Sequence, residues 1–355
     1  MEHRIRRLRQ EMTAGDVDGI LVLQPENRVY LSGFTGSAGI LLVTGREAML
    51  ITDFRYREQA AQQASDFTVL EHSGSITDKL REVIGQVGLK KVGFEKDFVT
   101  VAQHQEWQEK LTDIRLIPIQ GLLEKLRMIK DEQELSLIRK AVALADQAFE
   151  HIIDYLKPGV SELEAALELE FYLRRNGAEG VSFDIIVASG PRGSLPHATP
   201  TQRVMEYGDM VTMDFGAIYS GYCSDLTRTV FLGEARPKEK EIYGIVLEAQ
   251  EAALAAIAPG KPANAIDQVA RDIIAGKGYG DNFGHGLGHA VGLAVHEKPS
   301  LGKKDDTPLE PGMVITVEPG IYIPHWGGVR IEDMVVVTHR GCEILTRAEK
   351  GFVVV

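Results

Sequence analysis

The sequence predicts two domains, a small α/β domain followed by a larger α+β domain with an antiparallel sheet and flanking helices. The chain has 355 residues, which is too long for one ordinary hydrophobic core. Its first third alternates short apolar runs with amphipathic stretches, as α/β domains do. After residue 180, strand patterns with turn residues between them dominate. We place the domains at residues 1–122 and 123–355, with the boundary inside 118–130.

The elements of the first domain follow from the spacing of its apolar residues. Short apolar runs predict five strands, and apolar residues at helical spacing predict four helices. The strands are expected at 18–24, 39–44, 48–53, 91–95 and 115–119, and the helices at 4–12, 55–64, 76–87 and 101–111. Strands and helices that interleave in this way are typical of the α/β class.

The second domain opens with one long helical pattern over 122–156. A Ser-x-x-Glu capping box at 161–164 starts a second helix, which we expect to end near Asn176. Strand patterns follow at 181–190, 209–233, 311–324 and 327–346. Two further helices are expected at about 239–257 and, with Pro262 in its first turn, at 262–276.

The charge, the cysteine content and the apolar runs of the sequence indicate which partners and which compartment to expect. The formal net charge of −12 argues against binding to a nucleic-acid backbone. Only Cys223 and Cys342 are present, too few for a disulfide framework, which favours a reducing compartment. The first twelve residues lack the apolar core of a secretory signal, and no apolar run is long enough to cross a membrane. We therefore expect a cytoplasmic protein without nucleic-acid or membrane partners.

Residues 284–297, GHGLGHAVGLAVHE, hold three of the ten histidines: His285, His289 and His296. Glycines interleave the first two. Because each glycine costs a helix about 1 kcal/mol, we do not expect the helix that an HExxH zinc site needs. The stretch also lacks the preceding strand and the following acidic residue of a dinucleotide-binding loop. It therefore predicts an irregular backbone that brings imidazoles to a site formed with other segments.

Four acidic residues fall within or at the end of apolar strand patterns, where an unpaired carboxylate is costly. Asp214 and Asp225 lie eleven positions apart (225 − 214) on the two arms of a predicted hairpin and can face each other across it. Glu318 ends another strand pattern. Glu332 lies in the last one, with Arg330 two residues earlier and on the same face. Taken separately, a plain surface hairpin and a buried arginine–glutamate pair remain open as simpler interpretations.

Together with the histidines, these carboxylates favour a dinuclear metal site. Four carboxylates carry −4 and two divalent cations carry +4, so two ions neutralise the set, whereas one ion leaves it strongly anionic. An oxygen-rich set with a single imidazole favours Mn²⁺ or Co²⁺, and zinc and iron stay open.

The ordered acidic and histidine residues resemble the five metal ligands of the pita-bread metallopeptidases, which include methionine aminopeptidase, Xaa-Pro aminopeptidase and Xaa-Pro dipeptidase (prolidase). The stretches MDFGAIYSGYCSDLTRT, GHGLGHAVGLAVHE, PGMVITVEPGIYIP, GGVRIEDMVVVT and SLPHATP resemble the proline-specific branch. FTGSAG and TDFRY are similar to a creatinase-type N-terminal domain. The resemblance covers essentially the whole chain and implies a pita-bread catalytic domain after a creatinase-type domain.

The resemblance also implies a role for each ligand. Asp225 and Glu332 would bridge the two metals, and Asp214 would hold one metal alone. His289 and Glu318 would hold the other, with Glu318 also carrying a proton during the reaction.

Further residues take expected roles from the same resemblance. His296 would contact the substrate carbonyl as charge develops, His285 would line the pocket, and His197 would help to position the scissile bond. For His285, His296 and His197, a purely structural hydrogen-bonding role stays open. Arg330 would hydrogen-bond an acidic ligand or meet a substrate carboxylate, and Thr227 would support the ligands with its hydroxyl.

The activity implied is hydrolysis of the bond between an N-terminal residue and a following proline by a hydroxide that two metals activate. FTGSAG and TDFRY favour an Xaa-Pro aminopeptidase, and the alternative is an Xaa-Pro dipeptidase acting on dipeptides. A creatinase-like enzyme and a non-catalytic binding protein on the same fold are minor alternatives, because both would lack the ligand set. We expect two divalent ions per subunit, Mn²⁺ before Co²⁺ or Zn²⁺, a peptide substrate with proline in second position, and a homodimer.

Overall fold

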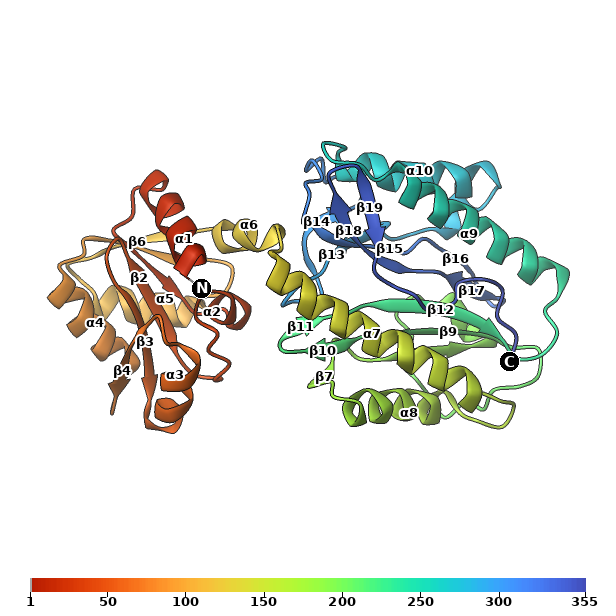
Figure 1. Cartoon of the computed structure of the whole chain (residues 1–355), viewed down its shortest axis with the longest axis horizontal. Helices are drawn as coiled ribbons and strands as arrows, with labels where there is room; N and C mark the ends of the chain where they lie inside the picture. The colour runs from red at the N-terminus through yellow and green to blue at the C-terminus, as the bar shows by residue number, and fades with distance from the viewer. Residues whose placement is uncertain (1) are drawn as a thin grey trace. The chain divides into compact units, whose positions relative to one another are not determined.

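The computed structural model describes residues 2–355. The chain divides into two compact units, one ending at Arg127 and the other running Met128–Val355. This division lies five residues beyond the predicted limit of the first domain (127 − 122). In Figure 1 the first unit runs from red to yellow and the second from yellow-green to blue.

A six-stranded mixed sheet, in the order β4-β3-β2-β1-β5-β6, forms the centre of the first unit. β1 pairs antiparallel with β2 and parallel with β5. The apolar faces of α4 and α5 pack on this sheet and form the core. The elements are α1 (Glu2–Ala14), β1 (Gly19–Val22), α2 (Pro25–Ser32), β2 (Ile40–Thr44), β3 (Ala48–Asp53), α3 (Arg57–Gln63), β4 (Thr68–His72), α4 (Ile76–Val87), β5 (Lys91–Glu95), α5 (Val101–Lys110), β6 (Arg115–Ile119) and α6 (Leu122–Met128).

The five strands and four helices predicted for this part are confirmed, and two elements were missed. β4 is a half-exposed strand at the edge of the sheet, so its apolar pattern is weak. α2 is only eight residues long and begins with Pro25, and such a short segment carries little helical periodicity.

The strand pairs of the second unit are all antiparallel, as predicted. The strands form sheets in the orders β11-β10-β7, β12-β9-β8, β14-β13-β15-β18-β19 and β16-β17. Their bounds are β7 (Gly180–Val181), β8 (Ile186–Ser189), β9 (Met210–Phe215), β10 (Ala217–Tyr219), β11 (Tyr222–Cys223), β12 (Leu226–Phe231), β13 (Gly288–Ala290), β14 (Glu297–Leu301), β15 (Val314–Val317), β16 (Gly320–Ile323), β17 (Gly327–Arg330), β18 (Asp333–Thr338) and β19 (Gly341–Ile344).

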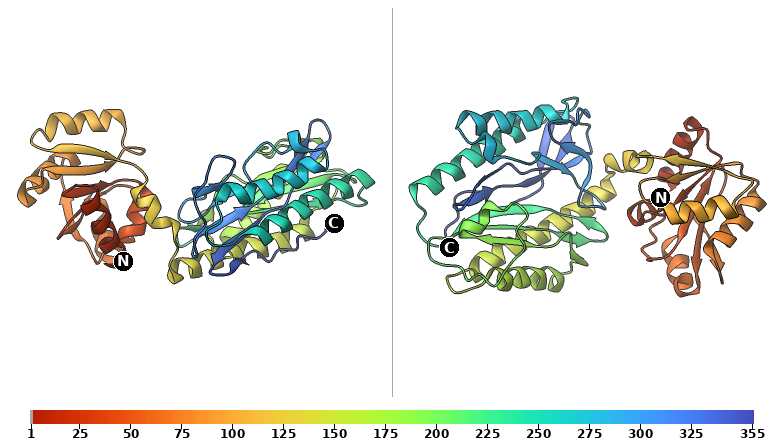
Figure 2. Two further views of the ribbon diagram at one scale, coloured as in Figure 1. Left: turned by 90° about the horizontal axis from the view of Figure 1, so that it is seen from above. Right: turned by 180° about the vertical axis from the view of Figure 1, so that it is seen from behind.

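Two pairs of helices enclose these strands (Figures 1 and 2). α7 (Glu132–Tyr155) and α8 (Glu162–Arg175) share one apolar core with β8, β9 and β12. α9 (Pro237–Ala256) and α10 (Ala263–Gly276) share another with β15, β17 and β18. Each group of strands therefore packs on its own pair of helices, and β17 of the second group contacts β9 and β12 of the first.

Three details of the prediction were wrong. The pattern over 122–156 is two helices, because Asp131 caps α7 in a capping box with Glu134 and the chain breaks before it. Pro262 is the N-cap of α10, just before its first turn. Glu332 does not lie within a strand: β17 ends at Arg330 and β18 begins after Glu332. Arg330 and Glu332 therefore do not share one face of a strand, contrary to the prediction.

Candidate metal centre

The hairpin predicted around the two aspartates forms between β9 and β12. Thr227 lies opposite Asp214, so Asp225 is displaced from Asp214 along the strands by two positions (227 − 225). The two arms approach closely at Gly216, where a Cβ atom would come 1.8 Å from the main-chain oxygen of Ser224. Glycine is therefore required at this position for the chain to pass into β10.

Asp214, Asp225 and Glu332 converge on one point. Each offers a carboxylate oxygen, and these oxygens lie within 4.8 Å of one another. Burial first, and then neighbouring carboxylates, raise the pKa of Asp225 and of Glu332 well above their ordinary values. Burial raises the pKa of Glu318 to about 8. The cluster therefore cannot be fully ionised at neutral pH without a compensating cation.

His289 faces the same cluster from β13. Its Nε2 lies 3.5 Å from Asp225 Oδ2 and 3.5 Å from Glu318 Oε1. Burial, followed by the nearby His296, lowers its pKa to about 4, so the ring is neutral near pH 7. Nδ1 donates to the carbonyl of Ala290 at 3.1 Å, which leaves the lone pair on Nε2. An acceptor nitrogen that faces two carboxylates is the arrangement that a metal ion requires.

Gly288 brings this histidine into position. A Cβ atom there would come 2.1 Å from the main-chain oxygen of Thr316 on β15. The Thr316 hydroxyl accepts from the His289 amide at 3.1 Å and lies 3.3 Å from Glu318 Oε1. Gly288 thus allows close packing of two strands. The segment is not a helix, as predicted, but residues 288–290 form strand β13 where an irregular backbone was expected.

The buried side chain of Arg330 links Asp214 and Glu332 through hydrogen bonds. Nη2 donates to Asp214 Oδ2 at 2.6 Å, and Nε donates to the Thr227 hydroxyl at 3.0 Å. That hydroxyl donates in turn to Glu332 Oε2 at 2.8 Å. Arg330 therefore forms its ion pair with Asp214, and its link to Glu332 passes through Thr227. The simple arginine–glutamate pair is not the observed arrangement.

Tyr322 is a residue of the site that the sequence interpretation missed. Its hydroxyl accepts from Arg330 Nη1 at 2.9 Å and lies 2.9 Å from His285 Nε2. Because His285 Nδ1 lies 2.8 Å from the carbonyl of Gly286, the ring donates there and accepts from Tyr322. A buried tyrosine in the apolar strand β16, four residues after Glu318, was the available signal, since a buried hydroxyl needs a partner.

The other two predicted histidines are exposed at the edge of the cluster. The ring of His296 lies 4.3 Å from that of His289 between centroids. His197 follows Pro196, whose carbonyl accepts from Arg330 Nη1 at 3.3 Å. The charge of His197 also contributes to the lowered pKa of His285, after burial and Arg330. Both histidines therefore stand where a bound peptide could reach them.

The donor set could hold two divalent cations. Among residues 2–355, the buried oxygens Asp214 Oδ1 and Glu332 Oε1 have no hydrogen-bond partner. Buried polar atoms without a partner are rare in proteins, and in an acidic cluster a cation is the partner expected. With the free Nε2 of His289, these atoms give the oxygen-rich set with one imidazole that the sequence predicts.

Comparison with known proteins agrees with this geometry. A family model described as metallopeptidase family M24 matches residues 136–339, and one described as creatinase/prolidase N-terminal domain matches residues 4–129. The chain belongs to metallopeptidase family M24. Membership of M24 confirms the family resemblance and the pita-bread and creatinase-type domains, and it makes the protein a peptidase.

Similar M24 proteins extend over the full chain. The Xaa-Pro dipeptidase from Bacillus anthracis is 47% identical with a TM-score of 0.98, covering 100% of this chain and 99% of that chain. The X-Pro aminopeptidase from Thermotoga maritima is 41% identical with a TM-score of 0.92, covering 96% and 98%. The Xaa-Pro dipeptidase of Pyrococcus furiosus is 39% identical over 99% of both chains.

Among the helices that the structure describes, none has both the length and the apolar composition needed to cross a bilayer.

Proposed function

We propose that this M24 protein is an Xaa-Pro dipeptidase that binds two divalent cations, with Mn²⁺ as the preferred metal. The observation that carries the metal site is the buried carboxylate cluster, in which two oxygens lack any partner among the described residues. The dipeptide substrate is supported by relatives such as those of Bacillus anthracis and Pyrococcus furiosus, whose names specify it.

Each ligand has a proposed place in the centre. Asp225 and Glu332 would bridge the two ions, Asp214 would complete one coordination set, and His289 with Glu318 would complete the other. When bound, two such ions lower the pKa of a shared water towards neutrality and polarise the scissile carbonyl.

The chain's own groups would move the proton and hold the developing charge. Glu318, a partly buried carboxylate whose charge the bound cations would stabilise, would take a proton from the water and pass it to the departing proline nitrogen. His296 would hydrogen-bond the carbonyl oxygen as negative charge develops on it. The Xaa-Pro bond is a tertiary amide without an N–H, so the site needs no acceptor for that hydrogen.

The remaining polar residues would orient these groups. Neutral His285, fixed by Tyr322, would line the pocket, and His197 would position the scissile bond. Arg330 would orient Asp214 instead of meeting a substrate carboxylate, because its side chain already donates to four groups of the protein.

The choice of dipeptidase reverses the order that the sequence favoured. The FTGSAG and TDFRY stretches favoured an aminopeptidase, yet relatives with the same two domains along their whole length carry the dipeptidase name. Aminopeptidase activity stays the second candidate, because the Thermotoga maritima neighbour is named an aminopeptidase. The peptidase relatives speak against the creatinase-like and non-catalytic alternatives.

The test is hydrolysis of Ala-Pro and Ala-Pro-Ala, measured side by side after reconstitution of the metal-free protein with Mn²⁺. We expect a higher kcat/KM for the dipeptide. A higher value for the tripeptide would establish the aminopeptidase instead.

Two variants control this assay. Asp225→Asn removes the charge of a proposed bridging ligand and should abolish hydrolysis and Mn²⁺ binding. Asp154→Asn makes the same change at an exposed position of α7 and should behave as the parent. Activity in Asp225→Asn equal to that of the parent would refute the proposed centre.

We carry three further expectations as part of this proposal: a homodimer, a cytoplasmic location, and peptides as the only class of partner. The homodimer rests on the family resemblance, the cytoplasmic location on the low cysteine content, and the exclusion of nucleic acid on the net charge of −12. Size-exclusion chromatography with light scattering tests the first, and a monomer at micromolar concentration would contradict it.

A further inference from the structure

Glu332 occupies an unusual place for a residue that must be held precisely in space. It lies between β17 and β18, so no strand pairing fixes its backbone. Its amide donates to the carbonyl of Thr227 at 3.2 Å, and its carboxylate accepts from the Thr227 hydroxyl. The carbonyl of Glu332 accepts from Arg228. Two adjacent residues of β12 therefore hold Glu332, Thr227 at its amide and carboxylate and Arg228 at its carbonyl.

Thr227 and Arg228 reach Glu332 from opposite sides. Neighbouring residues of a strand point to opposite faces, so the threonine faces the carboxylate cluster and the arginine faces away from it. The side chain of Arg228 is only 1% exposed. Its guanidinium donates to five acceptors, the carbonyls of Thr227, Glu332, Ala348 and Glu349 and the carboxylate of Asp333.

Asp333, the residue after Glu332, is the carboxylate partner of Arg228 and is held by further hydrogen bonds. Its Oδ1 accepts from Arg228 Nη2 at 2.8 Å. Its Oδ2 accepts from Gln250 Nε2 and from Lys350 Nζ, each at 2.8 Å. The main chain at 332–333 is therefore held on both sides.

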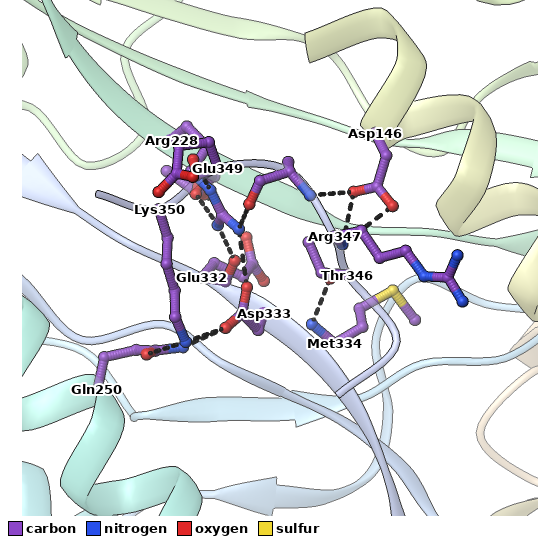
Figure 3. A network of polar contacts seen from close by, with 12 residues as sticks. Asp146, Arg228, Gln250, Glu332, Asp333, Met334, Thr346, Arg347, Glu349 and Lys350 are labelled. Atoms are coloured by element: carbon purple, nitrogen blue, oxygen red, sulfur yellow. Dashed lines mark hydrogen bonds and ion pairs between the residues drawn. The ribbon is translucent and has the colours of Figure 1, made fainter. Parts of the chain in front are cut away.

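Residues near the C-terminus complete this cluster, as Figure 3 shows. The carbonyls of Ala348 and Glu349 accept from Arg228. Asp146 of α7 accepts from the amides of Arg347 and Ala348 at 2.9–3.0 Å, which fixes this segment on the helix. Arg228 thus joins the chain at 348–349 to the chain at 332–333, on the side of Glu332 that faces away from the carboxylate cluster.

We infer that Arg228 is a positioning residue for the metal centre, which acts by fixing the main chain of Glu332. The inference rests on the proposed function, in which Glu332 would bridge two ions. A bridging ligand needs a fixed position. Residues that orient metal ligands typically contribute 10–100-fold to metal affinity. Arginine suits the place because its planar group offers five donors, whereas lysine offers three from a single atom.

Calorimetric titration of metal-free protein with Mn²⁺ alone tests this role, with Arg228→Met, Arg228→Lys and Arg139→Met as variants. Arg139 is the matched control, because it also forms an arginine–carboxylate pair in this unit, with Glu343. That pair lies on the surface, and Arg139 is far from Glu332 in the sequence. We expect Arg228→Met to bind at least one Mn²⁺ about 10–100-fold more weakly. Arg228→Lys should recover part of the loss, and Arg139→Met should match the parent.

Circular dichroism of the metal-free variants, recorded at the titration temperature, separates positioning from stability. A folded Arg228→Met that binds Mn²⁺ as the parent does would overturn the inference, even if its Tm is lower. If Arg228→Met does not fold, Arg228→Lys decides, because it keeps a positive charge beside Asp333. Weakened binding supports the role and parental binding overturns it. A parent that binds no Mn²⁺ would overturn the proposed function and this role together.

Discussion

Replacing Thr227 with valine removes one hydroxyl from the centre of the candidate metal site and changes little in shape. That hydroxyl accepts from Arg330 Nε at 3.0 Å and donates to Glu332 Oε2 at 2.8 Å. Thr227 is fully buried, so water cannot substitute for the lost group. The variant leaves a buried guanidinium donor and a buried carboxylate oxygen each without this partner.

The magnitude follows from these two bonds. The bond from the charged guanidinium contributes about 1.5–3 kcal/mol, and the bond to Glu332, whose raised pKa favours its neutral form without metal, contributes about 0.5–1.5 kcal/mol, so the two contribute about 2 kcal/mol at the lower end. In a unit of 150–250 residues each kcal/mol shifts Tm by about 2–4 °C, which predicts a decrease of about 4–8 °C for metal-free Thr227→Val. Because Thr227 also orients Glu332, we expect Mn²⁺ affinity to fall about 10–100-fold.

Calorimetric titration with Mn²⁺ and thermal melting of the metal-free protein measure both effects. Thr227→Ser is the matched control, since it keeps the hydroxyl and loses only a methyl group. Serine should restore most of the affinity. If valine and serine variants bind Mn²⁺ equally well, the hydroxyl does not orient Glu332 and the reasoning is wrong.

Three further predictions concern the histidine stretch and a helix cap. Burial and the charge of Arg330 lower the pKa of His285 to about 4 in the folded protein, against about 6.5 in the unfolded chain. Between pH 4 and 6.5 the unfolded chain therefore binds more protons than the folded protein. Stability should therefore fall as the pH drops from 6.5 through 4, and thermal melts of His285→Gln should show a flatter dependence; equal slopes would contradict the lowered pKa. Gly288→Ala forces a methyl group against Thr316, so chemical denaturation should show a free energy of unfolding lower by about 1–3 kcal/mol, and calorimetry should show weaker Mn²⁺ binding. Gly284→Ala should match the parent, because a Cβ atom at that position has nothing within 4 Å. Ser161→Ala should lower the free energy of unfolding in urea by about 1 kcal/mol, and the glycine variant by only a few tenths, because the hydroxyl caps α8; identical values for the two variants would argue against this cap.

Local signals in the sequence predicted much of the fold and the four candidate carboxylates, whereas the family resemblance selected His289 among the histidines. The Ser161 capping box, the glycine-rich histidine stretch and the acidic residues at the ends of apolar strands each depend on neighbours within a few positions. The same kind of signal was present at Asp131, where a second capping box marks the start of α7. There the continuous apolar periodicity across 122–156 masked it, and one helix was predicted in place of two.

By itself, the sequence determined which chemical groups could form a metal site and that its four carboxylates lie within or next to apolar strand patterns, because strand and turn patterns are set over short distances. Only the tertiary structure decided which groups meet. Arg330 pairs with Asp214, 116 positions away, and Arg228 holds the carbonyl of Glu332, 104 positions away. A buried arginine donates to whichever acceptors lie within hydrogen-bonding distance once distant strands have packed together. The periodicity of the sequence carries no information about those contacts.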